Sequence, residues 1–280
     1  MQDQSKIITK ESKSSFYYAF SLLPREKREA MNTVYAFCRK TDDIVDESNE
    51  DENIKYEQLR KWRNELEKAL HGQSEFFLLN KLAKIIRQFN IPLEPFFELI
   101  SGVEMDLQKK SYISFDDLIH YCYRVASTVG LMCIEIFGYK NNSAKDYAVN
   151  LGIAMQLTNI LRDVGKDVDK GRIYLPQKDL IKFNYTEKEL IQKKYNSNFK
   201  QLMEFESERA LYYFQKAEQF IDYEDKPLLF PARAMQHIYL KLLKKIKNKE
   251  YDVLNNQIRV NTFEKAAISL GVWAKYSLIY

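Results

Sequence analysis

The 280-residue sequence has few of the residues that interrupt helices. It contains only 8 Gly and 6 Pro, and this scarcity of turn-forming residues favours long helices over many short strands. Hydrophobic residues make up 45% of the chain and charged residues 29%, a balance that excludes a disordered or fibrous protein. We therefore expect a globular all-α protein.

The residues that zinc and redox sites require are also scarce. The 3 His are scattered without the spacing of zinc ligands. The 3 Cys (Cys38, Cys122 and Cys133) lie in apolar periodic segments without a C-x-x-C motif, so we expect them to pack in the core of a reduced, intracellular protein. The net charge of +4 is mild and no basic block is interleaved with aromatic residues, which argues against a nucleic-acid partner.

Long apolar runs are absent as well. The first residues, MQDQSKIITKESKSS, contain no apolar core of a signal peptide, and the run LMCIEIFGY is too short to span a membrane. We expect a cytoplasmic protein without an anchor. The lysine-rich segment KLLKKIKNKE is interpreted as a solvated helix face, with transient contact to an anionic membrane surface as the alternative.

Apolar positions recur with helical spacing along nearly the whole chain, which predicts about ten helices. The first four are expected at residues 24–47, 52–70, 75–89 and 93–108. Capping-box sequences at Ser114, Ser143, Thr186 and Asn261 begin segments that extend to about Gly138, Asp169, Lys194 and Tyr276. Further helices are expected at 199–221 and 228–249, and the one clear irregular segment is 169–177. No linker or repeat divides the chain, so we expect one domain, 1–280.

The stretch RKTDDIVDE, residues 39–47, concentrates acidic residues at the end of the first long helix. On a helical wheel, Asp43 and Glu47 point away from the apolar face and are expected to lie in water. Asp42 borders that face, on a stripe that also contains Tyr35, Arg39 and Asp46. Because Asp42 and Asp46 are neighbours of like charge, they indicate either a solvated helix end or a cation site.

A second helix carries a similar stripe. Gln156, Asn159, Asp163 and Asp167 follow one another at i, i+3, i+7 and i+11, beside an apolar face. Two such helices can close around a shared cleft, and oxygen ligands combined with substrate phosphates are typical of Mg²⁺. This pattern predicts a diphosphate substrate, with Arg39 and Arg162 paired to the phosphate oxygens.

These motifs, D-x-x-x-D at Asp42 and Asp46 and N-x-x-x-D-x-x-x-D at Asn159, Asp163 and Asp167, resemble those of the squalene and phytoene synthase family of head-to-head prenyl transferases. The stretches SSFYYAFSLLP, YCYRVASTVG, NILRDVGKDVDKGRIYLP and YDVLNNQIRV resemble further segments of that family. The similarity extends over most of the chain and is closest to bacterial dehydrosqualene synthases of carotenoid pathways.

The resemblance implies a fold, a reaction and a cofactor. The fold would be a class I isoprenoid synthase bundle of helices around a central cavity. The reaction would be the Mg²⁺-dependent condensation of two farnesyl diphosphates to dehydrosqualene through a cyclopropyl diphosphate, with about two or three Mg²⁺ ions and without NADPH. Rival interpretations are a phytoene synthase, an NADPH-dependent squalene synthase, and a non-catalytic relative that acts as an assembly module.

The resemblance also implies roles for individual residues. Mg²⁺ ligands would be Asp42, Asp46, Asn159, Asp163 and Asp167. Diphosphate contacts would be Ser12, Lys13, Ser14, Ser15, Tyr35, Arg39, Gln156, Arg162 and Tyr239, with either Arg259 or Gln257 at a further position. The expected catalytic set is Asp42, Asp46, Asp163, Arg39 and Arg162, with Tyr121 as a candidate for the cavity wall or for proton handling. Phe16 and Phe20 are candidates for limiting chain length, and Ser127 replaces a family glycine, so close helix approach would depend on Ala126 and Gly130.

Overall fold

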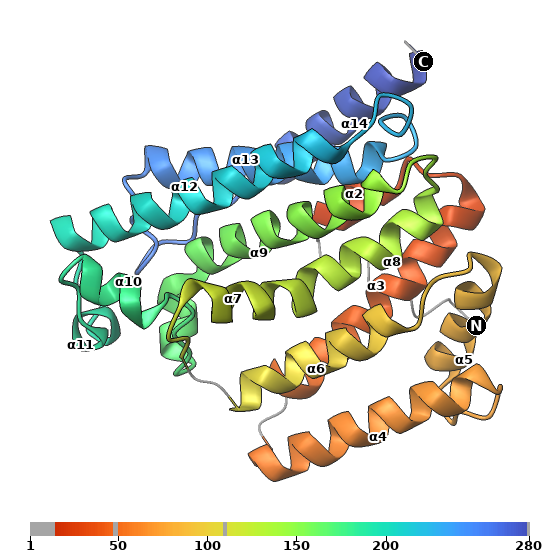
Figure 1. Cartoon of the computed structure of the whole chain (residues 1–280), viewed down its shortest axis with the longest axis horizontal. Helices are drawn as coiled ribbons and strands as arrows, with labels where there is room; N and C mark the ends of the chain where they lie inside the picture. Colours follow the sequence, from red (N-terminus) through yellow and green to blue (C-terminus); the bar gives the residue numbers. More distant parts are fainter. Residues whose placement is uncertain (1–14, 47–49, 109–110, 279–280) are drawn as a thin grey trace.

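The computed structural model describes residues 15–46, 50–108 and 111–278, and this part of the chain is mostly helical (Figure 1). The helices are α2 (Ser15–Phe20), α3 (Arg25–Asp46), α4 (Glu52–Leu70), α5 (Phe77–Gln88), α6 (Glu94–Gln108), α7 (Phe115–Cys122), the π-helix η1 (Tyr123–Ser127), α8 (Thr128–Phe137), α9 (Ser143–Asp169), α10 (Gln177–Lys182), α11 (Glu187–Ile191), α12 (Ser197–Phe220), α13 (Phe230–Asn248) and α14 (Thr262–Leu278). Ser111 and Ile173 form an isolated β-bridge, and the described ranges contain no β-strand. The all-α prediction is confirmed.

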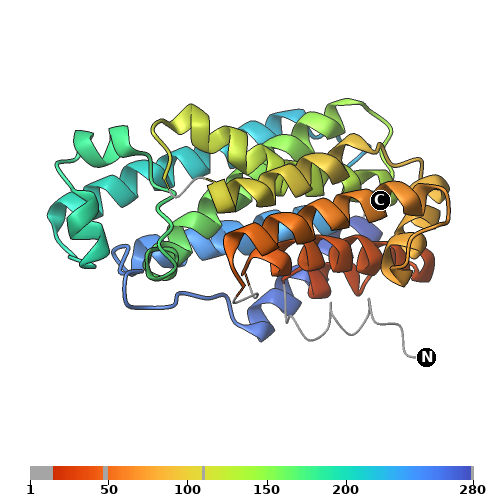
Figure 2. The ribbon, with the colours of Figure 1, turned by 90° about the horizontal axis from the view of Figure 1, so that it is seen from below.

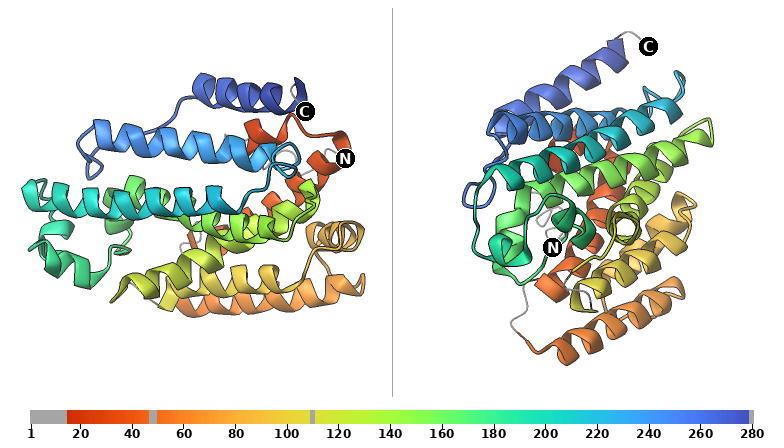
Figure 3. Two further views of the ribbon diagram at one scale, coloured as in Figure 1. Left: turned by 45° about the horizontal axis from the view of Figure 1, so that its top comes forward. Right: turned by 60° about the vertical axis from the view of Figure 1, so that its left-hand side comes forward.

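The long helices lie side by side, with α4 at one edge of the molecule and α14 at the opposite edge (Figures 1 and 3). Helix α9 runs through the middle and packs against α7, α8, η1, α12 and α13. The view from below shows α3 and α6 on the side of the molecule that carries α4 (Figure 2), and α3 contacts α4, α5 and α6. None of the helices in the described ranges is both long and apolar enough to cross a bilayer.

Local sequence signals explain most helix boundaries. Ser114 and Thr186 form complete capping boxes, and Asn261 and Glu264 exchange the same pair of bonds at the start of α14. The capping box predicted at Ser143 is wrong, because Ser143 is already helical and its hydroxyl donates to Asp222 at 2.7 Å. The segment predicted to be irregular also contains the start of α10, which begins directly after Pro176.

The centre of the molecule depends on close approach between α9 and the helix before it. A Cβ atom at Gly152 would lie 2.6 Å from the Cα of Ser127, and one at Gly130 would lie 2.9 Å from the carbonyl oxygen of Ala148. The prediction that Gly130 permits close approach is therefore confirmed. The second close contact comes from Gly152 on the facing helix, which compensates for the side chain of Ser127.

Replacing Gly152 with Ala is expected to lower the free energy of unfolding by about 1–3 kcal/mol, since the added methyl group meets backbone atoms that cannot rotate away. Chemical denaturation measures the change. The matched control is Gly271→Ala in α14, where a Cβ atom meets nothing within 4 Å and helix propensity predicts a gain of about 0.5–1 kcal/mol. Equal effects at the two glycines would contradict close packing at Gly152.

Candidate functional site

The two predicted acidic stripes face the same cleft. Asp42 and Asp46 from α3 and Asn159, Asp163 and Asp167 from α9 all line a polar cavity of about 210 Å³. Helix α6 contributes Asp106, and the segment after α9 contributes Arg172 and Tyr174. Residues more than 100 positions apart in the sequence therefore supply one concentrated set of carboxylates.

A larger cavity adjoins this cleft, and we call it the apolar cavity because most of its lining residues are apolar, although polar side chains also line it. Its volume is about 590 Å³, within the usual range for small-molecule sites of roughly 300–1,000 Å³. Its walls come from α3, α8, α9, α13 and their neighbours, and include Cys38, Val129, Ile134, Phe137, Leu151 and Met235. The polar cleft and the apolar cavity share several lining residues: Arg39, Asp42, Asp46, Val125, Gln156, Asn159 and Asp163. The three cysteines are buried thiols, as expected for core packing, although Cys38 and Cys133 also face this cavity.

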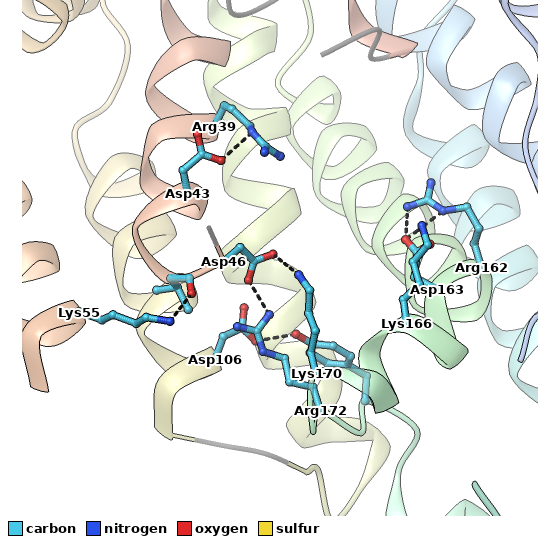
Figure 4. A network of polar contacts seen from close by, with 12 residues as sticks. Arg39, Asp43, Asp46, Lys55, Asp106, Arg162, Asp163, Lys166, Lys170 and Arg172 are labelled. Carbon is cyan, nitrogen blue, oxygen red and sulfur yellow. Dashed lines mark hydrogen bonds and ion pairs between the residues drawn. The ribbon is translucent and has the colours of Figure 1, made fainter. Parts of the chain in front are cut away.

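Asp46 is held by two cations from the segment that follows α9. Lys170 Nζ lies 3.1 Å and Arg172 Nη1 lies 2.7 Å from its carboxylate oxygens, and Figure 4 shows both side chains converging on it. Burial raises the pKa of Asp46, but the charge and hydrogen bond of Arg172, aided by Lys170, outweigh burial and hold the pKa below its ordinary value. Asp46 is therefore an ionised carboxylate at neutral pH.

Asp163 has its own cations on α9. It accepts hydrogen bonds from Arg162, and Lys166 Nζ lies 3.4 Å away (Figure 4). Burial raises the pKa of Asp163, but the hydrogen bond and charge of Arg162 outweigh it, with a smaller effect from Lys166, so the pKa is lowered. Asp163 is thus also ionised, and Arg162 reaches the apolar cavity beside it.

Asp42 and Asp167 lack comparable compensation. Desolvation, followed by the neighbouring carboxylates Asp46 and Asp106, raises the pKa of Asp42 to about 7. Desolvation and then Asp163 raise the pKa of Asp167 to about 7. Asp42 is exposed to solvent, but its exposed surface lies inside the concave cleft, so protein atoms still surround the carboxylate. The cleft therefore has more carboxylate than cation, which is the electrostatic requirement of a site for added positive charge.

Asp106 is a site residue that the helical patterns did not identify. Its carboxylate accepts hydrogen bonds from Tyr121 at 3.0 Å and from Tyr174 at 2.7 Å, and the two phenols are 3.3 Å apart. The sequence feature that could have identified Asp106 is its position, because it continues the buried stripe of Leu99 and Val103 on α6. A carboxylate in an apolar stripe needs a partner, and these two tyrosines provide it.

The segment before α10 is positioned by backbone contacts. The Gln177 amide donates to the Tyr112 carbonyl at 2.9 Å, and Ser111 and Ile173 form a β-bridge. These contacts hold Arg172 and Tyr174 against the cleft. The irregular segment expected from the sequence therefore contains two cleft residues, Arg172 and Tyr174.

The expectation that Asp43 lies in water is wrong. Its side chain is only 19% exposed, and Arg39 Nε lies 2.7 Å from its carboxylate (Figure 4). Helices α4, α5 and α6 all pack against α3 and so cover surface that a single-helix wheel assigns to solvent. Asp43 lines neither cavity, whereas Arg39 lines both. Glu47 lies outside the described residues.

The remaining predicted residues divide into three groups. Tyr35, Gln156 and Tyr239 line the apolar cavity, and Tyr121 lines the polar cleft. Arg259 and Gln257 are exposed, bonded to each other, and line neither cavity, whereas Lys265 of α14 does line the apolar cavity. Phe20 lines it as well. Ser12, Lys13 and Ser14 lie outside the described residues, and Ser15 and Phe16 are described only as part of helix α2.

The sequence and the fold are both similar to those of known proteins. The squalene/phytoene synthase family model matches residues 9–264. A phytoene synthase of Arthrospira platensis is 36% identical over 271 residues, which cover 92% of this chain and 87% of the relative. The 15-cis-phytoene synthase of Synechococcus elongatus is 34% identical over 275 residues, covering 94% and 89%. A crystal structure of a dehydrosqualene synthase in complex with ligand matches with a TM-score of 0.84 at 31% identity, covering 99% of this chain and 95% of that chain.

Replacing Tyr174 with Phe is expected to lower the free energy of unfolding by about 1.5–3 kcal/mol, because Asp106 loses its shortest hydrogen bond. Denaturant titration measures the loss. Tyr212→Phe is the control, since this tyrosine is 57% exposed and an isolated surface change stays within about 0.5 kcal/mol. A Tyr174→Phe protein as stable as the control variant would show that Asp106 does not depend on Tyr174.

Proposed function

The chain belongs to the squalene/phytoene synthase family and is a prenyltransferase, and from that premise we propose that it condenses two farnesyl diphosphates head to head to dehydrosqualene, for carotenoid biosynthesis. The observation that supports this proposal is the junction of the two cavities. A carboxylate-lined cleft adjoins an apolar cavity of about 590 Å³, and the residues at their junction belong to both. A prenyl diphosphate has the same division, with an anionic head and an apolar tail.

The donor set of the cleft fits Mg²⁺. Asp42, Asp46, Asn159, Asp163 and Asp167 would hold the ions, since all five present oxygen ligands to the cleft. Among the described residues, no three His, Cys, Asp or Glu side chains are grouped closely enough to hold an ion by themselves. Mg²⁺ typically takes one or two carboxylates together with waters and substrate phosphates, so the proposed ions would bind together with the substrate. When bound, Mg²⁺ would neutralise negative charge on the departing diphosphate.

The side chains of the chain itself would orient the substrate. Arg39 lines both cavities, and the apolar cavity is also lined by Lys265 and by Arg162, which donates a hydrogen bond to Asp163. These cations can pair with diphosphate oxygens, and the bidentate guanidinium groups would also fix the direction of the head group. Lys265 lines the cavity and Arg259 does not, so we propose Lys265 in place of Arg259 as a diphosphate contact.

The apolar walls would exclude water from the reacting carbons. Ionisation of an allylic diphosphate leaves a carbocation, which water converts to an alcohol. Val129 and Ile134 of α8 add hydrocarbon walls, and the thiol of Cys133 beside them stays protonated because burial raises its pKa to about 12. Tyr121 and Tyr174 stay protonated, because burial, and after it the charge of Asp106, raises the pKa of each phenol well above its ordinary value. Proton removal at the end of the reaction would therefore need an acceptor other than a phenolate.

Chain length decides between the close alternatives. Phe20 and Phe137 both line the apolar cavity, with ring centroids 6.1 Å apart, and we propose that these two rings limit the substrate to a fifteen-carbon tail. Phytoene synthases are among the relatives, so the condensation of two geranylgeranyl diphosphates to phytoene is the alternative. An NADPH-dependent squalene synthase differs only in the final reduction.

Incubation of the purified protein with Mg²⁺ and farnesyl diphosphate is expected to give dehydrosqualene with or without NADPH, identified by product mass. Parallel reactions with geranylgeranyl diphosphate test the alternative. Hydrocarbon from the twenty-carbon substrate alone would contradict the farnesyl assignment, and squalene formed on addition of NADPH would indicate the reductive reaction. A protein without turnover on either substrate would support a non-catalytic assembly role.

Replacing Asp42 or Asp163 with Asn is expected to lower kcat by at least about 100-fold, because each change removes a charge from the proposed ion site. Steady-state assays at saturating Mg²⁺ measure the loss. Asp169→Asn on α9 is the control, since that carboxylate is 63% exposed, pairs with Lys193 and lines neither cavity. Turnover close to wild type in both cleft variants would overturn the assignment of these carboxylates.

A further inference from the structure

The outward face of α14 is apolar. Phe263 is 81% exposed and Leu270 is 54% exposed, and Ala266, Ala267 and Gly271 are exposed between or beside them. These positions share one side of the helix, while Ser269, Val272 and Tyr276 on the other side are buried. A surface helix normally presents charged residues to water, so α14 has the reverse of the usual arrangement. We call this surface, formed by residues 263, 266, 267, 270 and 271, the α14 apolar face.

Lysines border the α14 apolar face on the neighbouring helix. Lys241 and Lys245 of α13 reach Glu264 of α14 at 3.1 and 2.6 Å, which places the two helices side by side (Figure 1). Lys244 is exposed on the same helix. Helix α13 contains no acidic residue, and Glu264 is the single acidic residue of α14. The border of the apolar face therefore carries more positive than negative charge, with Lys241 and Lys245 sharing the single carboxylate of Glu264.

The same two helices form a wall of the apolar cavity. Pro231, Ala232, Met235 and Tyr239 of α13 and Lys265 of α14 line that cavity from the inside. The cavity proposed to hold prenyl chains and the α14 apolar face thus lie on opposite sides of one helical layer. A hydrocarbon that left between these helices would enter whatever covers the face.

We propose that the α14 apolar face docks on the surface of an anionic lipid bilayer. Phe263 and Leu270 would insert at the headgroup level, and the α13 lysines would contact acidic headgroups. The basic border supports a lipid surface over a neutral protein partner, because each lysine near an anionic bilayer adds attraction. The benefit of this placement, direct release of a water-insoluble product into lipid, rests on the proposed function, whereas the docking itself does not.

Vesicle co-sedimentation without substrate tests the proposal. The full chain is expected to bind vesicles that contain phosphatidylglycerol, to bind pure phosphatidylcholine vesicles weakly, and to dissociate as salt rises. The double variant Phe263→Ser, Leu270→Ser is expected to have a vesicle affinity at least about tenfold lower, because it lacks the two apolar side chains that would insert into the bilayer. Lys244→Glu is expected to weaken binding to the anionic vesicles only.

The control is Phe77→Ser, a phenylalanine that is 76% exposed at the start of α5, and this helix lies away from α13 and α14 (Figure 1). This variant is expected to bind like wild type. Equal loss in the Phe77 and α14 variants, or no binding of wild type to anionic vesicles, would overturn the proposal. Wild-type dimers that the α14 double variant dissociates, without vesicle binding, would assign the face to a second copy of the chain. Thermal melts confirm that each variant folds, and binding is measured independently of turnover.

Discussion

Repulsion among carboxylates from three helices is the constraint on which the rest of the site depends. Asp42 and Asp46 from α3, Asp106 from α6, and Asp163 and Asp167 from α9 surround one cleft. Their charges cannot all be accommodated there without cations. The chain supplies part of the required positive charge. Lys170 and Arg172 pair with Asp46, and Arg162 and Lys166 pair with Asp163. The uncompensated remainder supports the proposal that the cleft binds Mg²⁺ together with a diphosphate.

The segment between α9 and α10 links this charge balance to the fold. Arg172 can reach Asp46 only because backbone contacts with residues 111–113 hold the segment across the cleft. The same contacts bring Tyr174 to Asp106. A short irregular segment therefore brings a carboxylate of α3 and one of α6 into contact with residues that follow α9. Its position is a tertiary property, since its partners are separated from it by more than sixty residues in the chain.

Close helix packing positions the apolar half of the site. At Gly152 and Gly130 the backbones of α9 and of the helix formed by η1 and α8 approach each other without intervening side chains. The π-helical turn η1 lies at this point and contributes Val125 and Ala126 to the cavity. Such turns change the direction of the helix and are frequent at functional sites. The cavity thus lies beside a contact that leaves no room for an added methyl group.

The sequence by itself determined the helical class, most helix boundaries and the two acidic stripes, because helical periodicity and capping act over a few residues. It also identified Asp42, Asp46, Asn159, Asp163 and Asp167 as residues that border packing faces. Only the tertiary structure decided that Asp43 is covered, that Asp106 joins the cleft and that Lys265 lines the cavity where Arg259 does not. A wheel describes one helix in isolation, whereas the exposure of a side chain depends on which other helices pack against it.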